Sequence, residues 1–431
     1  MSRPTRRQPA IALLTLSPRT RALALLVLAG EVVFFLPFVL PRVFRPTLLG
    51  ALGISNLELG TYFSAYGLVA VGAYFLGGPL ADRYPPHRLM AVALATTGAG
   101  GLYLATLPPS GGMLALYAAW GLTTILLFWA AMLRATRVVG GVGRQGLAFG
   151  ALEGGRGAVA AVIATAGVQV LAVAFPLDAV DADQAAQQAG LRAVALAFTA
   201  VVLVVASLVW WGLRGLSGDA DESAAPTERP WRGLAAAARR PQVWLLAVII
   251  LCAYSGYRVL DDVSLLASEV LGYGDVAAAR LGSLSLLLRP VAAVAAGLAA
   301  DRLSASRASL VAFALMLVGG AAMAAGPLGA AATWTVLAAV VLSCLGVYAL
   351  RGLYFALVDE GRTPLAATGA TIGLASVVGY LPDVYMGPLM GWLLDGWPGA
   401  KGHRLVFALA IGFAAVGALA VWAFRRSVGR G

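Results

Sequence analysis

The feature that most constrains this 431-residue chain is a series of long apolar runs separated by short polar gaps. Runs of about 18 residues or more are long enough, at about 1.5 Å per helical residue, to cross a hydrocarbon core about 30 Å thick. Only 12% of the residues are charged, whereas soluble domains carry roughly a quarter. The sequence therefore predicts an all-α, multi-pass membrane protein that lies in a lipid bilayer.

Twelve such runs predict twelve transmembrane helices. Their expected ranges are 21–44, 57–81, 88–107, 111–137, 146–174, 191–213, 242–268, 277–300, 307–327, 331–358, 365–394 and 403–424. Prolines and glycines inside these ranges are compatible with helix, because neighbouring helices in a membrane protein satisfy the freed backbone groups.

Arginines gather in three polar stretches, residues 1–20, 214–240 and 425–431. Basic residues that flank membrane helices are retained on the cytoplasmic side. We therefore expect two cytoplasmic tails and a cytoplasmic linker in a protein of the cytoplasmic (inner) membrane. The acidic connection that contains Asp178 and Asp181 is expected on the opposite side.

Residues 214–240 also divide the chain into an N-terminal six-helix bundle, 21–213, and a C-terminal one, 241–424. An internal repeat supports this 6+6 arrangement. The string GPLADRYPPHR, residues 78–88, is echoed by GLAADRLSASR, residues 297–307, with its glycine and aspartate at an offset of 219. The same offset relates two glycines of the fifth helix to two of the eleventh, which indicates a duplicated six-helix unit.

The repeated loop, Gly-x-x-x-Asp-Arg with basic residues after it, resembles the signature loop of the major facilitator superfamily. The likeness covers the whole chain, in the 6+6 helices, the basic central loop and the cytoplasmic termini. It implies a transporter whose two halves rock about a central site, with a conformational latch at this loop and its repeat. The latch residues would be Gly78, Asp82, Arg83, Arg88, Gly297, Asp301 and Arg302.

The resemblance has a physical basis in the residues of this loop. Gly78 permits the close approach of a neighbouring helix, and Asp82 can accept charge-assisted hydrogen bonds from a basic loop or a helix N-terminus. Such contacts form in one conformation and break in the other, which implies a latch for the outward-facing state. The sequence departs from the family pattern at Pro85 and Pro86, where a glycine is common. The alternative is a solvated charged turn with no switching role.

A narrower resemblance lies in the strings AFGALEGGRG, DDVSLLASEVLG and GYLPDVYMGPLMGWLLD. They look similar to a little-characterised bacterial branch near the organophosphate and organic-anion transporters. This resemblance implies an anionic substrate.

Ionisable residues inside the apolar runs are candidate functional groups, because each is costly in lipid unless it faces a cavity or a partner. They are Glu31, Arg134, Glu153, Arg156, Arg258, Asp261, Asp262, Arg289, Arg351 and Asp383. Glu31 is expected near mid-membrane, on a helical stripe with Phe35, Phe38 and Arg42. In the resembled fold the first, fourth, seventh and tenth helices line the central cavity. Glu31 and Phe35 are therefore predicted to contact substrate, and Glu31 to carry a coupling proton; the alternative is a structural ion pair with an arginine.

The seventh helix carries the string YSGYRVLDD, which places Tyr254, Arg258 and Asp261 or Asp262 on one stripe. Tyr254 and Arg258 are predicted to contact substrate or to form a gate at the mouth of the cavity. The two aspartates are alternative proton carriers. A structural Arg-Asp bridge within the helix fits the spacing equally well.

The eighth and tenth helices each contribute a deep arginine, Arg289 and Arg351, and Tyr348 and Phe355 share a stripe with Arg351. Few deep acids offset these arginines, so the cavity is expected to be positive. Guanidinium groups suit phosphate, sulfonate or carboxylate groups. The predicted anion site therefore combines Arg351 and Arg289 with Tyr348 and Tyr254.

Glycines of the fifth helix, Gly146, Gly150 and Gly154, recur every four residues, and Glu153 and Arg156 lie beside them. Such a stripe is typical of close helix packing. We expect a structural role first, with conformational rocking as the alternative.

No motif indicates an enzyme, a cofactor or a metal site. The pattern Gly141-x-Gly143-x-x-Gly146 follows a membrane helix rather than a strand, so dinucleotide binding is not expected, and no Walker loop indicates an ATP-driven pump. His87 and His403 lie far apart with no ligand spacing to cysteine. The net charge of +11 comes from arginines between helices rather than from a basic face, so no nucleic-acid partner is expected.

The sequence thus predicts a monomeric secondary transporter that moves a small organic anion by alternating access, driven by protons. The alternative within transport is an efflux pump for hydrophobic or cationic compounds. A different class is a non-transporting membrane sensor or scaffold that kept the fold. The familiar Gly-Pro signature of exporter-type fifth helices is missing, which favours uptake or exchange.

Overall fold

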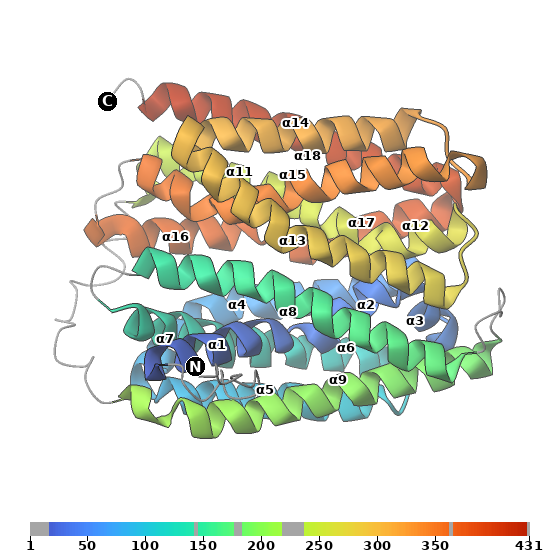
Figure 1. Ribbon diagram of the computed structural model, residues 1–431, viewed down its shortest axis with the longest axis horizontal. Helices are drawn as coiled ribbons and strands as arrows, with labels where there is room; N and C mark the ends of the chain where they lie inside the picture. The colour runs from blue at the N-terminus through green and yellow to red at the C-terminus, as the bar shows by residue number, and fades with distance from the viewer. Residues whose placement is uncertain (1–16, 142–144, 176–182, 218–236, 362–364, 429–431) are drawn as a thin grey trace, which may run out of the picture.

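The structure is a computed structural model that describes residues 17–141, 145–175, 183–217, 237–361 and 365–428. Within these ranges all regular secondary structure is helical, and the helices lie side by side along one long axis (Figure 1). The N-terminal elements are α1 (Pro18–Val32), η2 (Phe35–Val39), α2 (Leu40–Val43), α3 (Arg45–Leu52), α4 (Asn56–Arg83), α5 (Pro86–Leu104), α6 (Ser110–Gly121), η3 (Leu122–Trp129), α7 (Ala130–Gly140), α8 (Gln145–Ala174), α9 (Gln184–Gly212) and η4 (Arg214–Ser217). The C-terminal elements are α11 (Pro241–Val259), η5 (Leu260–Asp262), α12 (Val263–Glu269), α13 (Asp275–Leu303), α14 (Ala305–Ala325), η6 (Ala330–Ala332), α15 (Thr333–Glu360), α16 (Leu365–Gly379), α17 (Pro382–Gly396) and α18 (Ala400–Val428).

Each of the twelve predicted spans coincides with helix. Nine helices of the described residues are long and apolar enough to cross a membrane, and α1 followed by η2 and α2, at an angle of 40°, makes a tenth. The other two predicted ranges, 88–107 and 365–394, correspond to α5 and to the pair α16 and α17. The chain is therefore an all-α polytopic membrane protein, but four of its spans are not the continuous α-helices that the apolar runs predict. In the fourth of the twelve spans, the π-helix η3 separates α6 from α7.

The first span, predicted as one helix over 21–44, is broken after Val32 and continues as the π-helix η2. Pro37 lacks the N–H that would bond to the carbonyl of Val33, so the α-helical series of hydrogen bonds is interrupted here. A π-helical turn holds more residues than an α-helical turn. The side chains that follow therefore lie on different faces from those that a continuous helix predicts.

The eleventh span is split into α16 and α17 at Tyr380 and Leu381. Pro382 cannot donate to the carbonyl of Val378, which instead accepts from the N–H of Leu381 at 3.2 Å. In the seventh span the short 3₁₀-helix η5 separates α11 from α12. These breaks matter for the site, because charged residues lie beside each of them.

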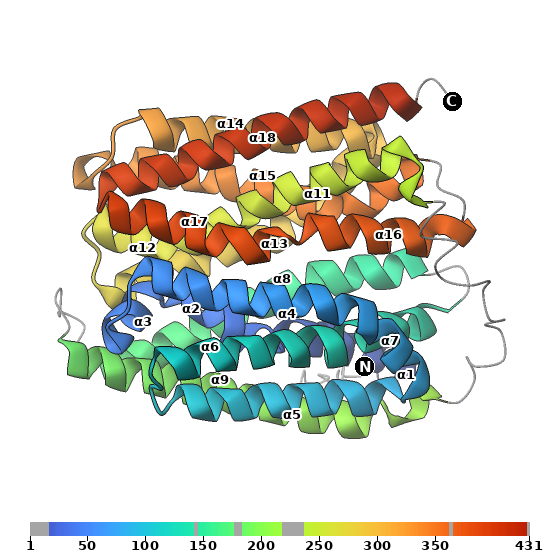
Figure 2. The same ribbon diagram turned by 180° about the vertical axis from the view of Figure 1, so that it is seen from behind.

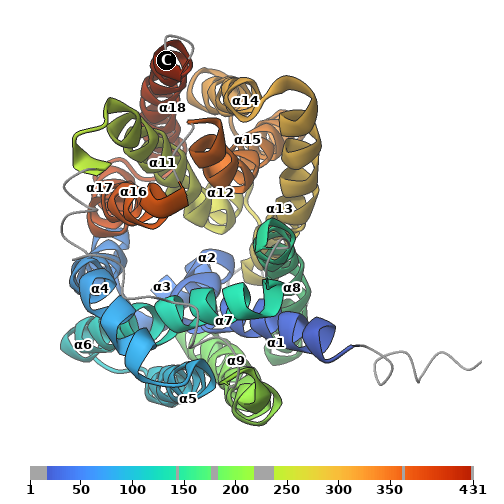
Figure 3. The same cartoon turned by 90° about the vertical axis from the view of Figure 1, so that its left-hand side faces the viewer.

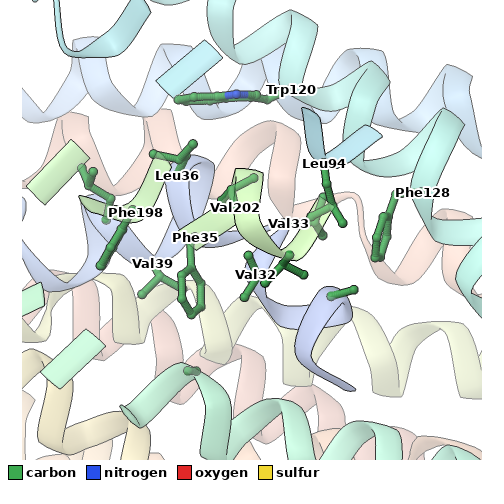
Figure 4. Packing of buried hydrophobic residues seen from close by; sticks show 14 of the residues in the cluster. Val32, Val33, Phe35, Leu36, Val39, Leu94, Trp120, Phe128, Phe198 and Val202 are labelled. Atoms are coloured by element: carbon green, nitrogen blue, oxygen red, sulfur yellow. The ribbon is translucent and has the colours of Figure 1, made fainter. Parts of the chain in front are cut away.

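Two hydrophobic cores divide the bundle into halves. One core extends from Ala22 to Leu213 and takes in two residues of α13, and the other extends from Leu246 to Phe424. We call the corresponding groups of helices the N half (α1 to α9) and the C half (α11 to α18). Figure 3 looks along the helices and shows the two halves on opposite sides, and Figure 4 shows part of the core of the N half.

The halves meet along two seams, α4 against α17 and α8 against α13 (Figures 2 and 3). We call the end of the bundle where α18 ends and α11 begins the terminus end, on the left in Figure 1. The opposite end, where α12 leads to α13, is the distal end.

The tails and the central linker are described only in part. Residues 1–16 and 218–236 lie outside the described residues, and so does most of the linker predicted over 214–240. The last helix, α18, continues through Arg425 and Arg426, which the sequence places in a tail beginning at 425. Two basic side chains in the last turn of a helix interact favourably with its dipole.

Candidate functional site

A cavity of about 70 Å³ lies between the two halves, near the middle of the bundle. Its wall contains the aromatic side chains Phe34, Phe38, Tyr66, Tyr74, Trp129, Tyr254, Tyr257 and Tyr380. It also contains five arginines and two carboxylates, which are Arg42, Arg156, Arg258, Arg289, Arg351, Glu31 and Asp383. A larger cavity of about 250 Å³ lies within the C half and has one charged lining residue, Arg240. The central cavity is the better candidate site, because charged groups from both halves converge on it.

One group of charges on this cavity centres on Glu31 of α1. Its carboxylate accepts from Arg156 Nε of α8 at 3.1 Å and from Arg289 Nη1 of α13 at 2.8 Å. Arg156 also bonds to Glu153, at 2.7 Å. Because Arg289 belongs to the C half, Glu31 joins the halves at mid-bundle, in the pairing with arginine that the sequence left open as an alternative.

A second group of charges lies nearer the distal end and centres on Asp261 of η5. This carboxylate binds Arg42 of α2, in the N half, at 2.5 Å and Arg258 of α11 at 2.9 Å. Arg258 also approaches Asp383 of α17 at 3.5 Å, and Tyr254 donates to Asp383 at 3.0 Å. Asp261 therefore forms the bridge to Arg258 that the spacing within the helix permits. It also forms an ion pair with Arg42 of the N half.

Arg351 of α15 differs from the other arginines of the cavity. Its Nε and Nη1 are buried from solvent and have no hydrogen-bond partner among the described residues. The guanidinium lies over the rings of Tyr257, at 4.1 Å, and Tyr254, at 5.6 Å. Aromatic faces attract a cation but do not satisfy its N–H groups.

The charge balance of the site follows from these pairings. The four carboxylates of the two groups are Glu31, Glu153, Asp261 and Asp383, and five arginines face them. One positive charge is left over among the described groups, and it resides on Arg351. An unsatisfied buried guanidinium can bind a carboxylate, phosphate or sulfonate oxygen pair.

Four residues predicted for the site do not line the central cavity, and Asp261, which bridges Arg42 and Arg258 nearer the distal end, is one of them. Phe35 lies in the core of the N half, with its ring 5.3 Å from that of Phe198 (Figure 4), because the break at η2 turns Phe34 and Phe38 to the cavity instead. Tyr348 is buried in the core of the C half, and its hydroxyl has no partner among the described residues. Asp262 faces away from the cavity and bonds to His403.

The sequence missed several residues that do line the cavity. Tyr257 lies one turn after Tyr254 on the same helix, so the stripe that predicts Tyr254 could have predicted it too. Tyr380 precedes the break in the eleventh span, and its ring packs against that of Tyr254 at 4.8 Å. Trp129 lies under Arg156 at 5.5 Å. No pattern in the sequence identifies Tyr380 or Trp129, because both depend on where separate helices meet.

The predicted latch residues lie at the terminus end and are exposed, apart from the half-buried Gly78. Arg134 donates to the backbone carbonyls of Ala81 and Asp82, at 2.5 and 3.3 Å. A Cβ atom at Gly78 or Gly297 would meet no heavy atom of the described residues within 4 Å. The close approach expected at Gly78 is therefore absent from this conformation. The side chain of Phe355 lies outside the described residues.

Glycines bring the backbones of α4 and α17 into contact at the distal end. A Cβ atom on Gly60 would lie 2.3 Å from the backbone of Gly387, and one on Gly391 would lie 2.5 Å from the backbone of Asn56. No larger residue fits at such a separation, so this part of the seam is packed backbone against backbone.

Polar contacts between the halves reinforce the distal closure. Asp395 of α17 accepts from the backbone N–H groups of Asn56, at 3.1 Å, and Leu57, at 2.7 Å, at the start of α4. Ser264 of α12 donates to the carbonyl of Arg42 at 2.7 Å. A carboxylate at a helix N-terminus satisfies free N–H groups and complements the helix dipole.

Glycines towards the terminus end make no such contact. A Cβ atom would meet no heavy atom of the described residues within 4 Å at a set of glycines on α4, α8, α13 and α16. They are Gly72, Gly78, Gly150, Gly154, Gly297 and Gly373. The backbone contacts of the distal end therefore have no counterpart at these glycines.

Metal binding has no support in the part of the chain that the structure describes. No group of three or more histidine, cysteine, aspartate or glutamate side chains there could hold an ion. The two cysteines, Cys252 and Cys344, are buried and unpaired.

Comparison with known proteins agrees with this architecture. A family model described as the Major Facilitator Superfamily matches residues 26–382. The chain is 27% identical over 415 residues to the inner membrane protein YqcE of Escherichia coli (strain K12), covering 93% of each chain. It is 24% identical over 412 residues to the inner membrane protein YihN of the same organism, covering 92% of this chain and 93% of that one.

Solved structures show the same fold at lower identity. A bacterial homologue of the human lysosomal transporter Spinster, inward-facing and unoccupied, matches with a TM-score of 0.73 and 14% identity, covering 96% of this chain and 98% of that one. A mutant of the nucleoside transporter NupG matches with a TM-score of 0.68 and 12% identity, covering 95% of this chain and all of that one. Both likenesses concern the fold alone.

Proposed function

The chain belongs to the major facilitator superfamily and is a membrane transporter, and from this premise we propose that it moves a small organic anion by alternating access, driven by protons. The anion binds in the central cavity, between the two halves. Arg351 is its main contact, with Tyr254 and Tyr257 beside it. No catalytic step and no cofactor take part.

The observation that carries this proposal is the unsatisfied guanidinium of Arg351. Burying a charged group without hydrogen bonds is costly, so such a group in a cavity favours a ligand that supplies acceptors. The excess of arginines over carboxylates favours an anion over a cation. Drug-sized ligands occupy pockets of about 300–1,000 Å³, whereas this cavity measures about 70 Å³, which favours a small solute over the bulky substrates of an efflux pump.

The orientation proposed for the chain places both termini in the cytoplasm of a cell with this protein in its inner membrane. The support is the concentration of arginines in the tails and the central linker. In that orientation the distal end faces outwards, so the conformation described here is inward-facing. Arg42 with Asp261, and the glycines of α4 and α17, then form the outer gate.

Proton coupling is assigned to Glu31. Its carboxylate bonds at once to Arg156 of its own half and Arg289 of the other. Protonation removes the negative charge and so weakens the bond between the halves. Glu31 thereby links the protonation state of the cavity to the separation of the halves, and the chain works as a monomer because each monomer contains both.

The test is uptake of radiolabelled small carboxylates, organophosphates and sulfonates into proteoliposomes with an imposed pH gradient. Arg351→Ala is expected to lower uptake at least tenfold, because an unpaired charge-assisted contact is worth about 1.5–3 kcal/mol. Arg280→Ala is the matched control, since Arg280 is an exposed arginine of α13. Glu31→Gln is expected to retain exchange of the anion but to lose its dependence on the gradient.

Three results of these assays would contradict the proposal. If Arg351→Ala and Arg280→Ala transport anions equally well, Arg351 does not bind the substrate. Movement of cations or hydrophobic dyes alone would favour an efflux pump, and no movement of any solute would favour a membrane sensor.

A further inference from the structure

A second cluster of ionisable groups lies outside the central cavity, at the distal end of the C half. His403, near the start of α18, is fully buried, and both of its ring nitrogens face carboxylates. Nδ1 lies 2.6 Å from Asp262 of η5, and Nε2 lies 3.2 Å from Glu269 at the end of α12. Asp262 is also fully buried, whereas the side chain of Glu269 is 32% exposed.

This geometry sets the number of protons that the cluster holds. A hydrogen bond needs one proton between its two heavy atoms, and a carboxylate oxygen facing a bare ring nitrogen would place two lone pairs together. A neutral imidazole carries one N–H and can serve only one of the two contacts. With both contacts present, the cluster of Asp262, His403 and Glu269 therefore contains one proton more than a neutral imidazole and two carboxylates.

The cluster holds both ends of one short element. Asp262 immediately precedes α12 and Glu269 is its last residue, so a single imidazole ties down the start and the end of this helix. The same element faces the N half. Ser264 of α12 donates to the backbone of Arg42, and Asp261 binds the Arg42 guanidinium. These two contacts of the distal end thus depend on a segment that His403 fixes to the C half.

We propose that Asp262, His403 and Glu269 form a proton-binding site that holds α12 in place and makes opening of the distal end depend on the pH on that side of the membrane. This inference rests on the alternating-access part of the proposed function, but it requires neither an anionic substrate nor proton transport. The partly exposed Glu269 gives protons a route to the buried imidazole.

The direction of the effect follows from the burial of the two carboxylates. When the extra proton leaves, one of the two hydrogen bonds of His403 must break. The remaining N–H of His403 stays with Asp262, because water cannot solvate the charge of this buried carboxylate. Glu269 turns into solvent, which frees the end of α12. The hydrogen bond that Glu269 accepts from the backbone N–H of Gly399, at 3.3 Å, is lost at the same time. High pH therefore loosens α12 and favours opening of the distal end, and low pH favours closure.

Other charged groups on the neighbouring helices have partners elsewhere. Arg258 of α11 faces Asp261 and Asp383, and Asp395 of α17 faces the start of α4. On α18 itself, Lys401 lies 5.6 Å from the ring of Trp397, and Arg404 donates to the carbonyl of Ala324 at the end of α14. The carboxylates that bond to His403 in the described structure are those of Asp262 and Glu269.

The experiment measures the distance between spin labels at the distal end as pH is varied, in detergent and without substrate. Labels are attached to Gly111→Cys at the start of α6 and Trp334→Cys on α15, in a chain whose buried Cys252 and Cys344 are replaced by alanine. A Cβ at Gly111 meets no neighbouring atom, and Trp334 is 84% exposed. The ratio of long to short distances is expected to rise about tenfold between about pH 5 and about pH 10.

The decisive variant is Glu269→Gln. A glutamine N–H can donate to the bare Nε2 of a neutral imidazole, so both contacts survive without the extra proton. The short distance is then expected at every pH. Glu58→Gln, which alters an exposed glutamate at the distal end of α4, is expected to keep the wild-type pH dependence.

Two results would overturn the inference. One is a distance distribution of the unaltered chain that does not change with pH. The other is an unchanged pH dependence in Glu269→Gln. Because no substrate is present, failure of the anion proposal in the transport assay leaves this test intact.

Discussion

The two ends of the seams between the halves use the same residue type in opposite ways. At the distal end, Gly60, Gly387 and Gly391 lie in backbone contact with the facing helix, where no side chain fits. At the terminus end, Gly78 and Gly297 face open space. A glycine in a helix costs about 1 kcal/mol relative to alanine. Under the proposed alternating access, we infer that Gly78 and Gly297 are packed in the conformation in which the terminus end is closed.

The largest effect is expected from the ion pairs of the distal end. Asp261→Ala leaves Arg42 and Arg258 buried without the carboxylate that they share, and breaking a buried pair in this way costs about 3–5 kcal/mol. The distal labels should report mainly the open state, and the thermal unfolding midpoint should fall. Asp301→Ala, an exposed aspartate of the terminus end, is the control, and an equal loss there would remove the contrast between the ends.

A smaller effect is expected from filling a distal glycine. Gly391→Leu forces a side chain against the backbone of α4, where its Cβ would lie 2.5 Å from Asn56. Overpacking of this kind costs about 1–3 kcal/mol. Gly373→Leu alters the other segment of the same span, where space is open, so its label distances should match those of the unaltered chain. A shift towards the distal-open state in both variants would contradict the assignment.

The cap that α17 gives to α4 is expected to contribute less. Asp395→Ala removes the acceptor for two backbone N–H groups at the start of α4, those of Asn56 and Leu57. Loss of an N-terminal cap typically costs about 1 kcal/mol. The ratio of open to closed distal distances should rise about fivefold. Asp395→Asn retains an acceptor and should recover part of the loss; if it does not, charge rather than hydrogen bonding dominates.

The smallest effect on stability is expected at the terminus end. Gly78→Ala should raise the thermal midpoint slightly, because alanine gains up to about 1 kcal/mol in a helix and meets no atom here. If the terminus end closes through Gly78, the same change should slow transport. Gly72→Ala, also on α4 and open, tests whether the slowing is specific to the latch position.

The spans and the fold of this chain follow from its sequence, because apolar runs of membrane length leave few alternatives to helix. The positions of individual side chains follow only where the helix is regular. Tyr254 and Arg258 line the cavity as their stripe on α11 predicts, and so do Arg289 and Arg351. Phe35 does not, since the break at η2 lies between it and Glu31.

The sequence does not predict which charged residues of the two halves bind each other. The bonds of Glu31 to Arg289 and of Arg42 to Asp261 join residues more than two hundred positions apart. The sequence does not predict the proposed site at His403 either. The two carboxylates that bond to this histidine come from another span, and His403 belongs to no motif. The spacing rules that predict i,i+3 and i,i+4 neighbours apply within one helix and are silent between helices.

The π-helical turn at η2 has a consequence for how the first span can vary. Glu31 lies before this turn and Arg42 after it, and each finds its partner in the C half. Removing one residue from the turn would rotate everything beyond it by about 100° relative to α1. Arg42 would then point away from Asp261 although no charged residue had changed. The length of this turn, counted in single residues, is therefore as much a determinant of the closure of the distal end as the charges that form it.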